Sequence, residues 1–410
     1  MRALREGATF ETERLLDPAE GVARYLAATG LAPLGVERVP LAAAFGRILA
    51  AAAAADADYP ADDRSTMDGF AVRSADGTAT RRIVGAVRMG HPPPGPIGPG
   101  EAMRIPTGGV LPPGADAVVP IEDAVERGDQ LTVAAPPAPR DSLTPRGDDM
   151  RAGDPVLEAG RRIAAPELSV LATLGYDTVA VFKRPRVAVI STGDELVDVA
   201  ARPGTGQVRD SNRWAIAGCL ASFGCEVLHL PRAADEVATI RDGIARGLRE
   251  ADAVVLTGGS SVGARDHVPA AIDGLGAPGV IVHGLRVRPG KPTVLAAIGA
   301  QPVIGLPGNP TSALTILDAV TGPIFHALTG ERGAVRATVA SIAAVPFAGR
   351  PGWTWFVPAS LAPDGARPIA LRSSHTSLLA RADGYVVVGP GRVPIEAGEP
   401  VTVVRYGGTR

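Results

Sequence analysis

The Gly/Ser-rich segment TGGSSVGARDH, residues 257 to 267, directly follows the apolar run ADAVVL and combines small residues with a carboxylate and a histidine. Its GSSVG portion fits the G-x-S-x-G pattern of a hydrolase nucleophile elbow, in which Ser261 would be the nucleophile. The same small residues could instead expose backbone N–H groups to an oxyanion such as phosphate or a metallate. The rest of the chain must decide between a nucleophile and an oxyanion cradle.

The hydrolase hypothesis requires an acid and then a histidine downstream of Ser261. Asp266 and His267 are too close in sequence to build that arrangement, and Asp318 and His326 fall in a predicted helix. We therefore favour the cradle.

Three more Gly-rich segments lie near strand-like runs: STGDEL (191 to 196), RPGKP (288 to 292) and GLPGNP (305 to 310). In a parallel sheet, ligands bind outside the carboxyl ends of the strands. We expect at least STGDEL, TGGSSVG and GLPGNP to open on one edge of such a sheet. Several turns on one edge favour a ligand site over isolated structural turns.

The charged residues of these loops indicate the ligand. Arg288 and Lys291 carry fixed positive charge that suits an oxyanion. Four carboxylates offer the hard oxygen ligands that Mg²⁺ prefers: Asp194, Glu195, Asp235 and Asp266. Donors, cations and carboxylates together predict a phosphate ester bound beside a divalent metal.

Common nucleotide motifs do not account for these loops. GLRVRPGKPT has one residue too many between Gly284 and Gly290 for a P-loop, and Pro292 occupies the Ser/Thr position. GTGQVRD, from residue 204, has only the first two glycines of a dinucleotide fingerprint. Neither a P-loop NTPase nor a Rossmann dehydrogenase is supported.

The elements that must position these loops alternate between strand and helix over residues 184 to 330. Six runs are strand-like: RVAVIS, CEVLHL, DAVVLT, GVIVHGLRV, TVLAAI and PVIGL. Helical patterns separate the first of these runs from one another, and the segment PTSALTILDAVTGPIFHAL is predicted to be a closing helix. This alternation predicts a three-layer α/β domain with a mostly parallel sheet.

The whole chain is predicted to be multidomain, α/β plus β. Residues 1 to 47 and 145 to 183 form a discontinuous helical domain, with helices in LLDPAEGVARYLAATG, PLAAAFGRILAAAA and APELSVLATLGYDTVAVF. Residues 48 to 144 form an inserted β domain with strands in GFAVRS, RRIVGAV, ADAVVPIE and QLTVAAP. Residues 331 to 410, with ATVASIAAV, TWFVPASL, GYVVVG and EPVTVVRY, are predicted to form a C-terminal β-barrel.

Composition limits the possible partners. A net charge of −2 gives no basic excess for binding nucleic acid or an anionic membrane. The first residues mix both charge signs without an apolar run, so we expect neither signal peptide nor membrane span, and a cytoplasmic location. Cys219 and Cys225 lie in an apolar run and are expected to be buried thiols, and the six scattered histidines predict no zinc site.

Read together, the motifs resemble those of the molybdopterin molybdenumtransferase family, the bacterial enzymes related to the E domain of gephyrin. The resemblance spans nearly the whole chain, with the motifs in family order: DDRSTMDGFAVR (62 to 73), RIPTGGVLPPGADAVVPIED (104 to 123), PRGDDMRAGD (145 to 154), RPRVAVISTGDEL (184 to 196), DSNRW (210 to 214), TGGSSVGARDH, RPGKP and GLPGNPTSA (305 to 313).

The resemblance implies a four-domain chain and an elongated homodimer whose active-site cleft lies between subunits. It implies that molybdate is inserted into the dithiolene of adenylylated molybdopterin, with Mg²⁺ assisting cleavage of the phosphoanhydride and release of AMP. Contacts with other molybdenum-cofactor biosynthesis proteins and with apo-molybdoenzymes are also implied. The cradle interpretation of the opening motif follows from it.

The resemblance also assigns roles to residues. Metal ligands are expected at Glu195, Asp235 and Asp266. Catalytic positions are expected at Asp63, Asp68, Thr107, Asp149, Glu195, Asp235, Arg288 and Lys291. Cofactor-binding positions are expected at Thr257, Gly258, Gly259, Ser260, Ser261, Gly263, Asp266, Pro307, Gly308, Asn309 and Ser374, and Arg350 is a further candidate.

Three positions depart from the family pattern. Arg64 stands where a neutral amide is common, Ser260 replaces a valine, and Arg288 replaces a lysine. These departures leave two alternatives open: a carrier or scaffold that binds molybdopterin without turnover, and a variant that inserts tungstate.

Overall fold

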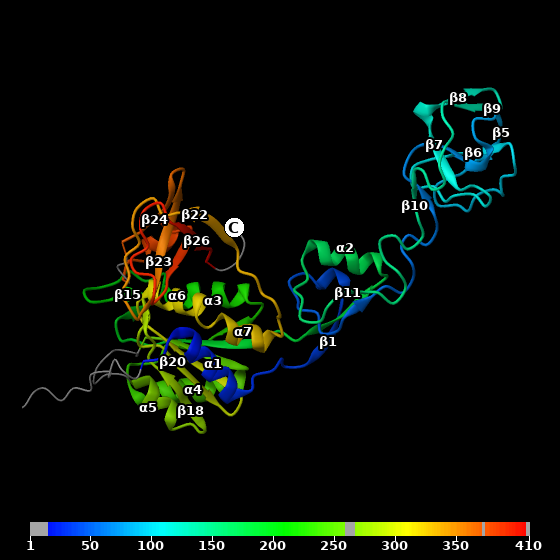
Figure 1. The fold of residues 1–410 in the computed structure, drawn as a ribbon. Coiled ribbons are helices and arrows are strands. Elements are labelled where there is room, and N and C mark those ends of the chain that lie inside the picture. Colours follow the sequence, from blue (N-terminus) through cyan, green and yellow to red (C-terminus); the bar gives the residue numbers. More distant parts are fainter. Residues whose placement is uncertain (1–14, 259–266, 371–373, 407–410) are drawn as a thin grey trace, which may run out of the picture. The chain divides into compact units, whose positions relative to one another are not determined.

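The computed structural model describes residues 15 to 258, 267 to 370 and 374 to 406 (Figure 1). The chain divides into two compact units. The first unit comprises Met1–Ala50, Gly160–Ala165 and Thr178–Arg410, and the second comprises Ala51–Ala159 and Pro166–Asp177. The division into four domains stays a prediction.

The first unit is built on a six-stranded sheet. Its strand order is β16 (Glu226–His229), β13 (Arg186–Ser191), β17 (Ala253–Thr257), β21 (Gln301–Leu306), β20 (Val294–Ile298) and β18 (Pro278–His283). The first four strands run parallel, and β20 and β18 are antiparallel to their neighbours. The prediction of a mostly parallel sheet is confirmed.

Helices cover both faces of this sheet (Figure 1). One face packs against α4 (Val237–Glu250) and α5 (His267–Asp273). The other face packs against α1 (Pro18–Thr29), α3 (Asn212–Ser222), α6 (Pro310–Ala319) and α7 (Gly322–Thr329). The predicted three-layer architecture is therefore confirmed.

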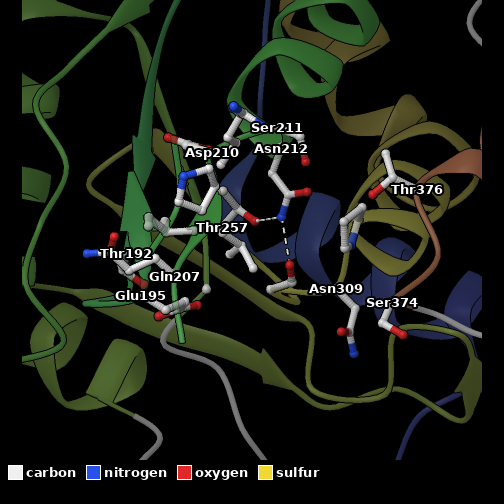
Figure 2. A pocket seen from close by; sticks show the side chains of 17 residues that line it. Thr192, Glu195, Gln207, Asp210, Ser211, Asn212, Thr257, Asn309, Ser374 and Thr376 are labelled. Atoms are coloured by element: carbon white, nitrogen blue, oxygen red, sulfur yellow. Dashed lines mark hydrogen bonds between the residues drawn. The ribbon is translucent and has the colours of Figure 1, made fainter. Parts of the chain in front are cut away.

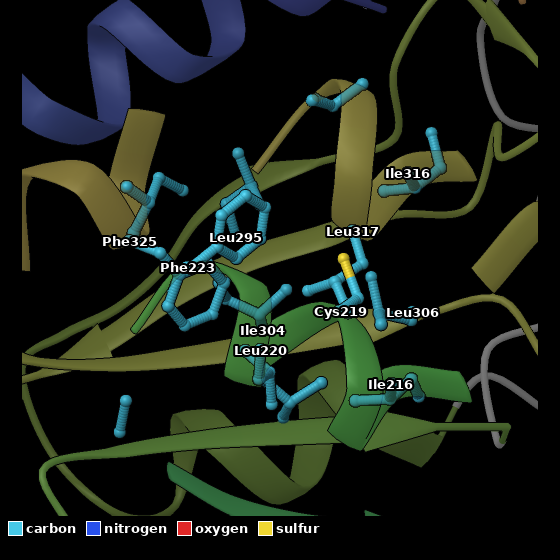
Figure 3. Packing of buried hydrophobic residues seen from close by; sticks show 14 of the residues in the cluster. Ile216, Cys219, Leu220, Phe223, Leu295, Ile304, Leu306, Ile316, Leu317 and Phe325 are labelled. Carbon is cyan, nitrogen blue, oxygen red and sulfur yellow. The ribbon is translucent and has the colours of Figure 1, made fainter. Parts of the chain in front are cut away.

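The larger apolar cluster packs the helices α1, α3, α6 and α7 against their face of the sheet (Figure 3). Phe223 stacks on Phe325 with ring centroids 5.6 Å apart. Cys219 and Cys225 are buried in the same cluster, as predicted. Burial raises the pKa of the Cys225 thiol to about 12, which keeps it protonated.

One of the predicted helices is wrong. Over residues 40 to 53 only a short 3-10 turn forms, η2 (Leu41–Ala43), and Gly46, which follows it, has a φ of +73° that a helix does not contain. Ile48 and Leu49 then form antiparallel bridges to Arg162 and Val181. Tertiary pairing overrides the helix propensity of this alanine-rich stretch.

The predicted helix over residues 165 to 182 is correct only in its first half. α2 (Ala165–Thr173) ends before Gly175, which has a φ of +78°. The β-branched run that follows forms β12 (Thr178–Phe182), antiparallel to β1 (Val36–Pro40).

The predicted closing helix is two helices. Between α6 and α7 the hydroxyl of Thr321 donates to the carbonyl of Leu317 at 2.7 Å, and a proline lies in the first turn of α7. A proline at that place starts a new helix rather than continuing the old one.

The C-terminal part of the first unit is a second sheet. Its order is β19 (Val287–Arg288), β23 (Thr354–Ala362), β25 (Gly384–Val388), β26 (Pro400–Val404) and β22 (Thr338–Ile342), with β24 (Gly365–Pro368) also paired to β23. The short helix α8 (Ser377–Arg381) precedes β25. The four predicted strands are present, and an isolated bridge joins Ala343 to Ala366. Closure into a barrel stays a prediction.

The second unit contains another six-stranded sheet. Its order is β7 (Ala117–Pro120), β4 (Gly69–Val72), β6 (Glu101–Ile105), β5 (Arg81–Ala86), β9 (Gln130–Val133) and β8 (Ala124–Arg127). The second unit also contains two short antiparallel strand pairs: β2 (Ala53–Ala54) with β11 (Pro155–Leu157), and β3 (Arg64–Ser65) with β10 (Leu143–Thr144). The four predicted strands are confirmed as β4, β5, β7 and β9, whereas β6 and β8 were not predicted.

Among the described residues, no helix combines the length and the apolar character needed to cross a membrane.

Candidate functional site

The Gly-rich loops of the first unit meet at one edge of the α/β sheet. β13, β17 and β21 are parallel neighbours, so the segments that follow them open on their shared carboxyl edge. β20 begins with Val294 paired to Gly305 near the end of β21, which brings the RPGKP segment to the same edge. For the parts of these segments that the structure describes, the predicted convergence is confirmed.

A cavity of about 780 Å³ lies at this edge. Figure 2 shows Glu195 and Gln207 on one side of it, and Asn309, Ser374 and Thr376 on the other. Six sequence-predicted residues line it: Glu195, Thr257, Gly258, Gly308, Asn309 and Ser374. Thr192, Gln207, Asp210, Ser211, Asn212 and Thr376 also line it and were not predicted.

The turn after β17 requires glycine. The Thr192 amide donates to the Thr257 carbonyl at 2.9 Å, which joins the ends of β13 and β17. Gly258 has a φ of +94°, and a Cβ there would lie 2.2 Å from the Thr192 carbonyl oxygen. A larger residue at 258 would push these strand ends apart.

Asn212 links three parts of the pocket wall. Its Nδ2 donates to Thr257 Oγ1 at 2.9 Å and to the Gly308 carbonyl at 2.7 Å, as the dashed lines in Figure 2 show. It stands in the DSNRW motif, but it was not among the predicted site residues. An amide at the start of a helix beside the predicted ligand edge is the signal that could have identified it.

Two helices begin at the pocket. Asn212 is the first residue of α3 and Pro310 is the first residue of α6, and both line the cavity. Unpaired N–H groups and the helix dipole at such ends favour a negatively charged ligand. The wall is therefore suited to a phosphate ester.

Acidic side chains lie beside this wall. Glu195 is exposed at the pocket. Asp235 does not line the cavity, but Ala233 pairs with Thr192 and the Asp235 amide donates to Asp194 Oδ1 at 3.3 Å. Asp235 Oδ1 is buried and has no hydrogen-bond partner among the described residues.

The predicted basic pair lies outside the cavity lining. The Arg288 guanidinium lies over the Trp355 ring, 4.5 Å from its centroid. This contact joins β19 to β23, where Arg288 and Trp355 are cross-strand partners. Lys291 accepts through its carbonyl from the Leu285 amide at 2.9 Å.

Pro307 and the segment of Ser374 frame the pocket from two directions. The Pro307 carbonyl accepts from the Thr257 hydroxyl at 3.3 Å. The Thr311 hydroxyl of α6 donates to the His375 carbonyl at 3.3 Å, next to Ser374. Arg350 stacks over Trp353 at 5.2 Å and does not line the cavity.

Five predicted positions lie outside the described residues: Gly259, Ser260, Ser261, Gly263 and Asp266. The structure does describe the remote residues that a Ser261 hydrolase would need. Asp318 pairs with Arg336, and His326 Nδ1 lies 3.0 Å from Glu331 Oε2. Both side chains are engaged in structural pairs, which supports the rejection of the hydrolase hypothesis.

The second unit holds the other predicted residues. Asp68 Oδ1 accepts from the Thr107 amide at 2.7 Å and from its hydroxyl at 3.1 Å. Asp63 Oδ1 accepts from the Arg146 amide at 2.7 Å. Arg64, the departure from the family pattern, donates to the Gly108 carbonyl at 3.2 Å. These side chains hold turns in place.

Asp149 lines a separate open cavity of about 600 Å³ within the second unit, together with Tyr59, Asp154 and Ser169. The predicted site residues are thus divided between the two units.

Comparison with known families covers most of the chain. Residues 16–175 match the MoeA N-terminal region (domain I and II), residues 188–327 match a probable molybdopterin binding domain, and residues 340–406 match the MoeA C-terminal region (domain IV). The middle match contains the α/β sheet and its pocket edge.

Individual relatives agree. The chain is 31% identical over 406 residues to the molybdopterin molybdenumtransferase of Synechococcus elongatus, covering 95% of this chain and 99% of the relative. It is 34% identical over 304 residues to that of a Nostoc species, covering 72% and 70%. A crystal structure of the molybdopterin biosynthesis MoeA protein from Pyrococcus horikosii has a TM-score of 0.78 at 30% identity, covering 96% of this chain and 99% of that one.

Proposed function

Because the chain belongs to the molybdopterin molybdenumtransferase family, it is a transferase of molybdenum cofactor biosynthesis, and we propose that it inserts molybdate into adenylylated molybdopterin with Mg²⁺-assisted release of AMP. In this reaction the phosphoanhydride is cleaved and the molybdenum becomes bound to the pterin dithiolene. The observation that carries the proposal is the pocket at the carboxyl edge of the α/β sheet.

The pocket offers what cleavage of a phosphoanhydride needs, which is mainly positioning and charge neutralisation. The N-termini of α3 and α6 would hold a phosphate group, and Asn309, at the N-cap of α6, and Ser374 add polar side chains to the lining. Because sulfur ligation comes from the pterin itself, the protein needs no cysteine at the site.

The described carboxylates fit Mg²⁺. Magnesium is usually held by one or two protein carboxylates together with substrate phosphates, so a cluster of three acids is not required. Asp235 has a buried Oδ1 without a partner among the described residues, and Glu195 presents an exposed carboxylate at the pocket. We propose Glu195, Asp235 and Asp266 as the ligands, and bound Mg²⁺ would neutralise phosphate charge.

The basic residues have a separate role in the proposal. Arg288 is held on Trp355, and its guanidinium would receive molybdate or a phosphate oxygen together with Lys291. Asp63, Asp68, Thr107 and Asp149 would contribute from the second unit. A homodimer with its cleft between subunits is part of the proposal, as are contacts with other cofactor-biosynthesis proteins and apo-molybdoenzymes.

The test measures AMP release from adenylylated molybdopterin with and without Mg²⁺, in the presence of molybdate or tungstate. We expect release that depends on both the oxyanion and Mg²⁺, and a decrease of roughly 100-fold in Asp235→Asn, because the amide cannot balance the metal charge. The same assay compares molybdate with tungstate.

Tight binding of the substrate without AMP release would contradict the proposal and indicate a molybdopterin carrier. In that case Arg64→Asn, which restores the neutral amide common in the family, tests whether the cation blocks turnover.

A further inference from the structure

Asn212 makes two hydrogen bonds with a single nitrogen, and they reach two different loops. One goes to Thr257 at the end of β17 and the other to Gly308, just beyond the end of β21. The two partners are 45 and 96 residues away along the chain. One side chain at the start of α3 therefore joins both Gly-rich turns of the pocket.

The direction of these bonds is fixed by chemistry. The Gly308 carbonyl oxygen can only accept, so the NH₂ group of Asn212 must face it. The Thr257 hydroxyl donates to the Pro307 carbonyl at 3.3 Å, which leaves its oxygen free to accept from Asn212. The three groups form a chain in which every donor has an acceptor.

The turns that Asn212 joins are in direct contact. A Cβ added to Gly308 would lie 3.4 Å from the Cα of Gly258, and Gly258 is itself confined against Thr192. A small shift of either turn would change the spacing of the backbone around the pocket. Thr257 is 2% exposed, so water does not easily replace its bonds.

We propose that Asn212 is a positioning residue: its amide sets the spacing of the turns after β17 and β21, and so the fit of the pocket to the phosphate of the pterin substrate. This inference rests on the proposed function, because it assigns the substrate phosphate to that pocket. Asn212 acts through Gly258 and Gly308 and takes no part in the chemical step.

Asn212→Asp tests the proposal, because a carboxylate of the same shape cannot donate to the Gly308 carbonyl. We expect KM for adenylylated molybdopterin to rise by about tenfold, equivalent to about 1.4 kcal/mol. We expect kcat to stay within roughly twofold, because the lost interaction acts on binding. The Kd for the same substrate, measured by pterin fluorescence without molybdate, should rise in parallel.

Gln301 provides a matched control at the opposite end of β21. Its Nε2 also donates two hydrogen bonds, in this case both to carbonyl oxygens, of Leu248 at 3.0 Å and Ala251 at 2.9 Å. Gln301→Glu therefore makes the same amide-to-carboxylate change away from the pocket. Both Asn212→Asp and Gln301→Glu should lower the unfolding temperature. Gln301→Glu should leave KM and Kd for adenylylated molybdopterin unchanged.

Thr257 variants keep the test decisive if Asn212→Asp does not fold. Thr257→Val removes the hydroxyl and should raise Kd, whereas Thr257→Ser retains the hydroxyl and should raise Kd much less. The double variant Asn212→Asp/Thr257→Val should show less than the sum of the two effects, because both changes disrupt one network.

A folded Asn212→Asp with wild-type KM and Kd would overturn the inference, and so would fully additive effects of the two substitutions. Failure of the proposed function has a different signature, in which the wild-type protein itself releases no AMP.

Discussion

Two sets of polar groups beside the α/β sheet differ in their hydrogen bonding. One set lies at the pocket edge, and the other anchors the neighbouring segments to the sheet. Thr192 Oγ1, Asn212 Oδ1 and Asp235 Oδ1 are buried without a hydrogen-bond partner among the described residues. By contrast, Glu331 accepts from both Arg162 and His326. Unsatisfied buried groups cost folding free energy, and a bound ligand would complete those at the pocket edge, whereas paired groups contribute to stability.

The largest loss of stability is expected at Arg336. This residue pairs with the fully buried carboxylate of Asp318 and donates to the Tyr385 hydroxyl at 2.7 Å, which joins α6 to β25. Arg336→Met removes the cation that pairs with this buried carboxylate, so we expect the free energy of unfolding to fall by about 3 to 5 kcal/mol. Urea unfolding followed by tryptophan fluorescence measures this, since Trp214, Trp353 and Trp355 all lie in the first unit.

Arg246→Met is the control for that variant. Arg246 pairs with Glu250 at 2.8 Å on the exposed surface of α4, and such pairs contribute little. Equal losses of unfolding free energy in Arg336→Met and Arg246→Met would contradict the expectation that a buried anchoring pair stabilises the fold more than an exposed surface pair.

An intermediate effect that depends on pH is expected at Glu331. Burial alone would raise the pKa of this carboxyl, but hydrogen bonds from His326 and Arg162 outweigh it and lower the pKa from 4.5 to about 2. A depressed pKa stabilises the fold above the unfolded-state value, and this stability is lost as the pH falls from about 4.5 towards 2. Glu331→Gln should cost about 2 to 3 kcal/mol at neutral pH and remove most of that dependence.

Urea midpoints of both proteins between pH 2.5 and pH 7 check this prediction. Curves that remain parallel over the whole range would show that Glu331 is not the group responsible.

The smallest effect on stability is expected at the pocket. Glu195→Gln changes an exposed side chain and should alter the free energy of unfolding by about 0.5 kcal/mol or less. AMP release should nevertheless fall by roughly 100-fold, because a metal ligand is lost. A stable, fully active Glu195→Gln would remove this residue from the proposed metal site.

The sequence identified the α/β part well because strand and helix periods alternate regularly there. It failed where tertiary contacts decide the conformation: residues 40 to 53 carry helix-forming alanines, but Ile48 and Leu49 bridge to distant segments. β6 was missed because its residues EAMRI include two charged side chains, although the three apolar residues between and after them are buried.

The candidate site was predicted in part for similar reasons. Glycines after parallel strands are local signals, and they located the pocket edge. The two hydrogen bonds of Asn212 could not be predicted, because its partners are distant in the chain and come together only through the sheet order. The stacking of Arg288 on Trp355 likewise depends on the pairing of β19 with β23.

Helix α6 begins at the pocket with Pro310 and carries Asp318 near its other end, where Arg336 and the C-terminal sheet meet it. A chain shortened after Gly330 would remove Arg336, which pairs with Asp318, and would also lose Ser374 and Thr376 from the pocket wall. The C-terminal sheet is therefore not a detachable module. A minimal enzyme engineered from this protein has to retain it.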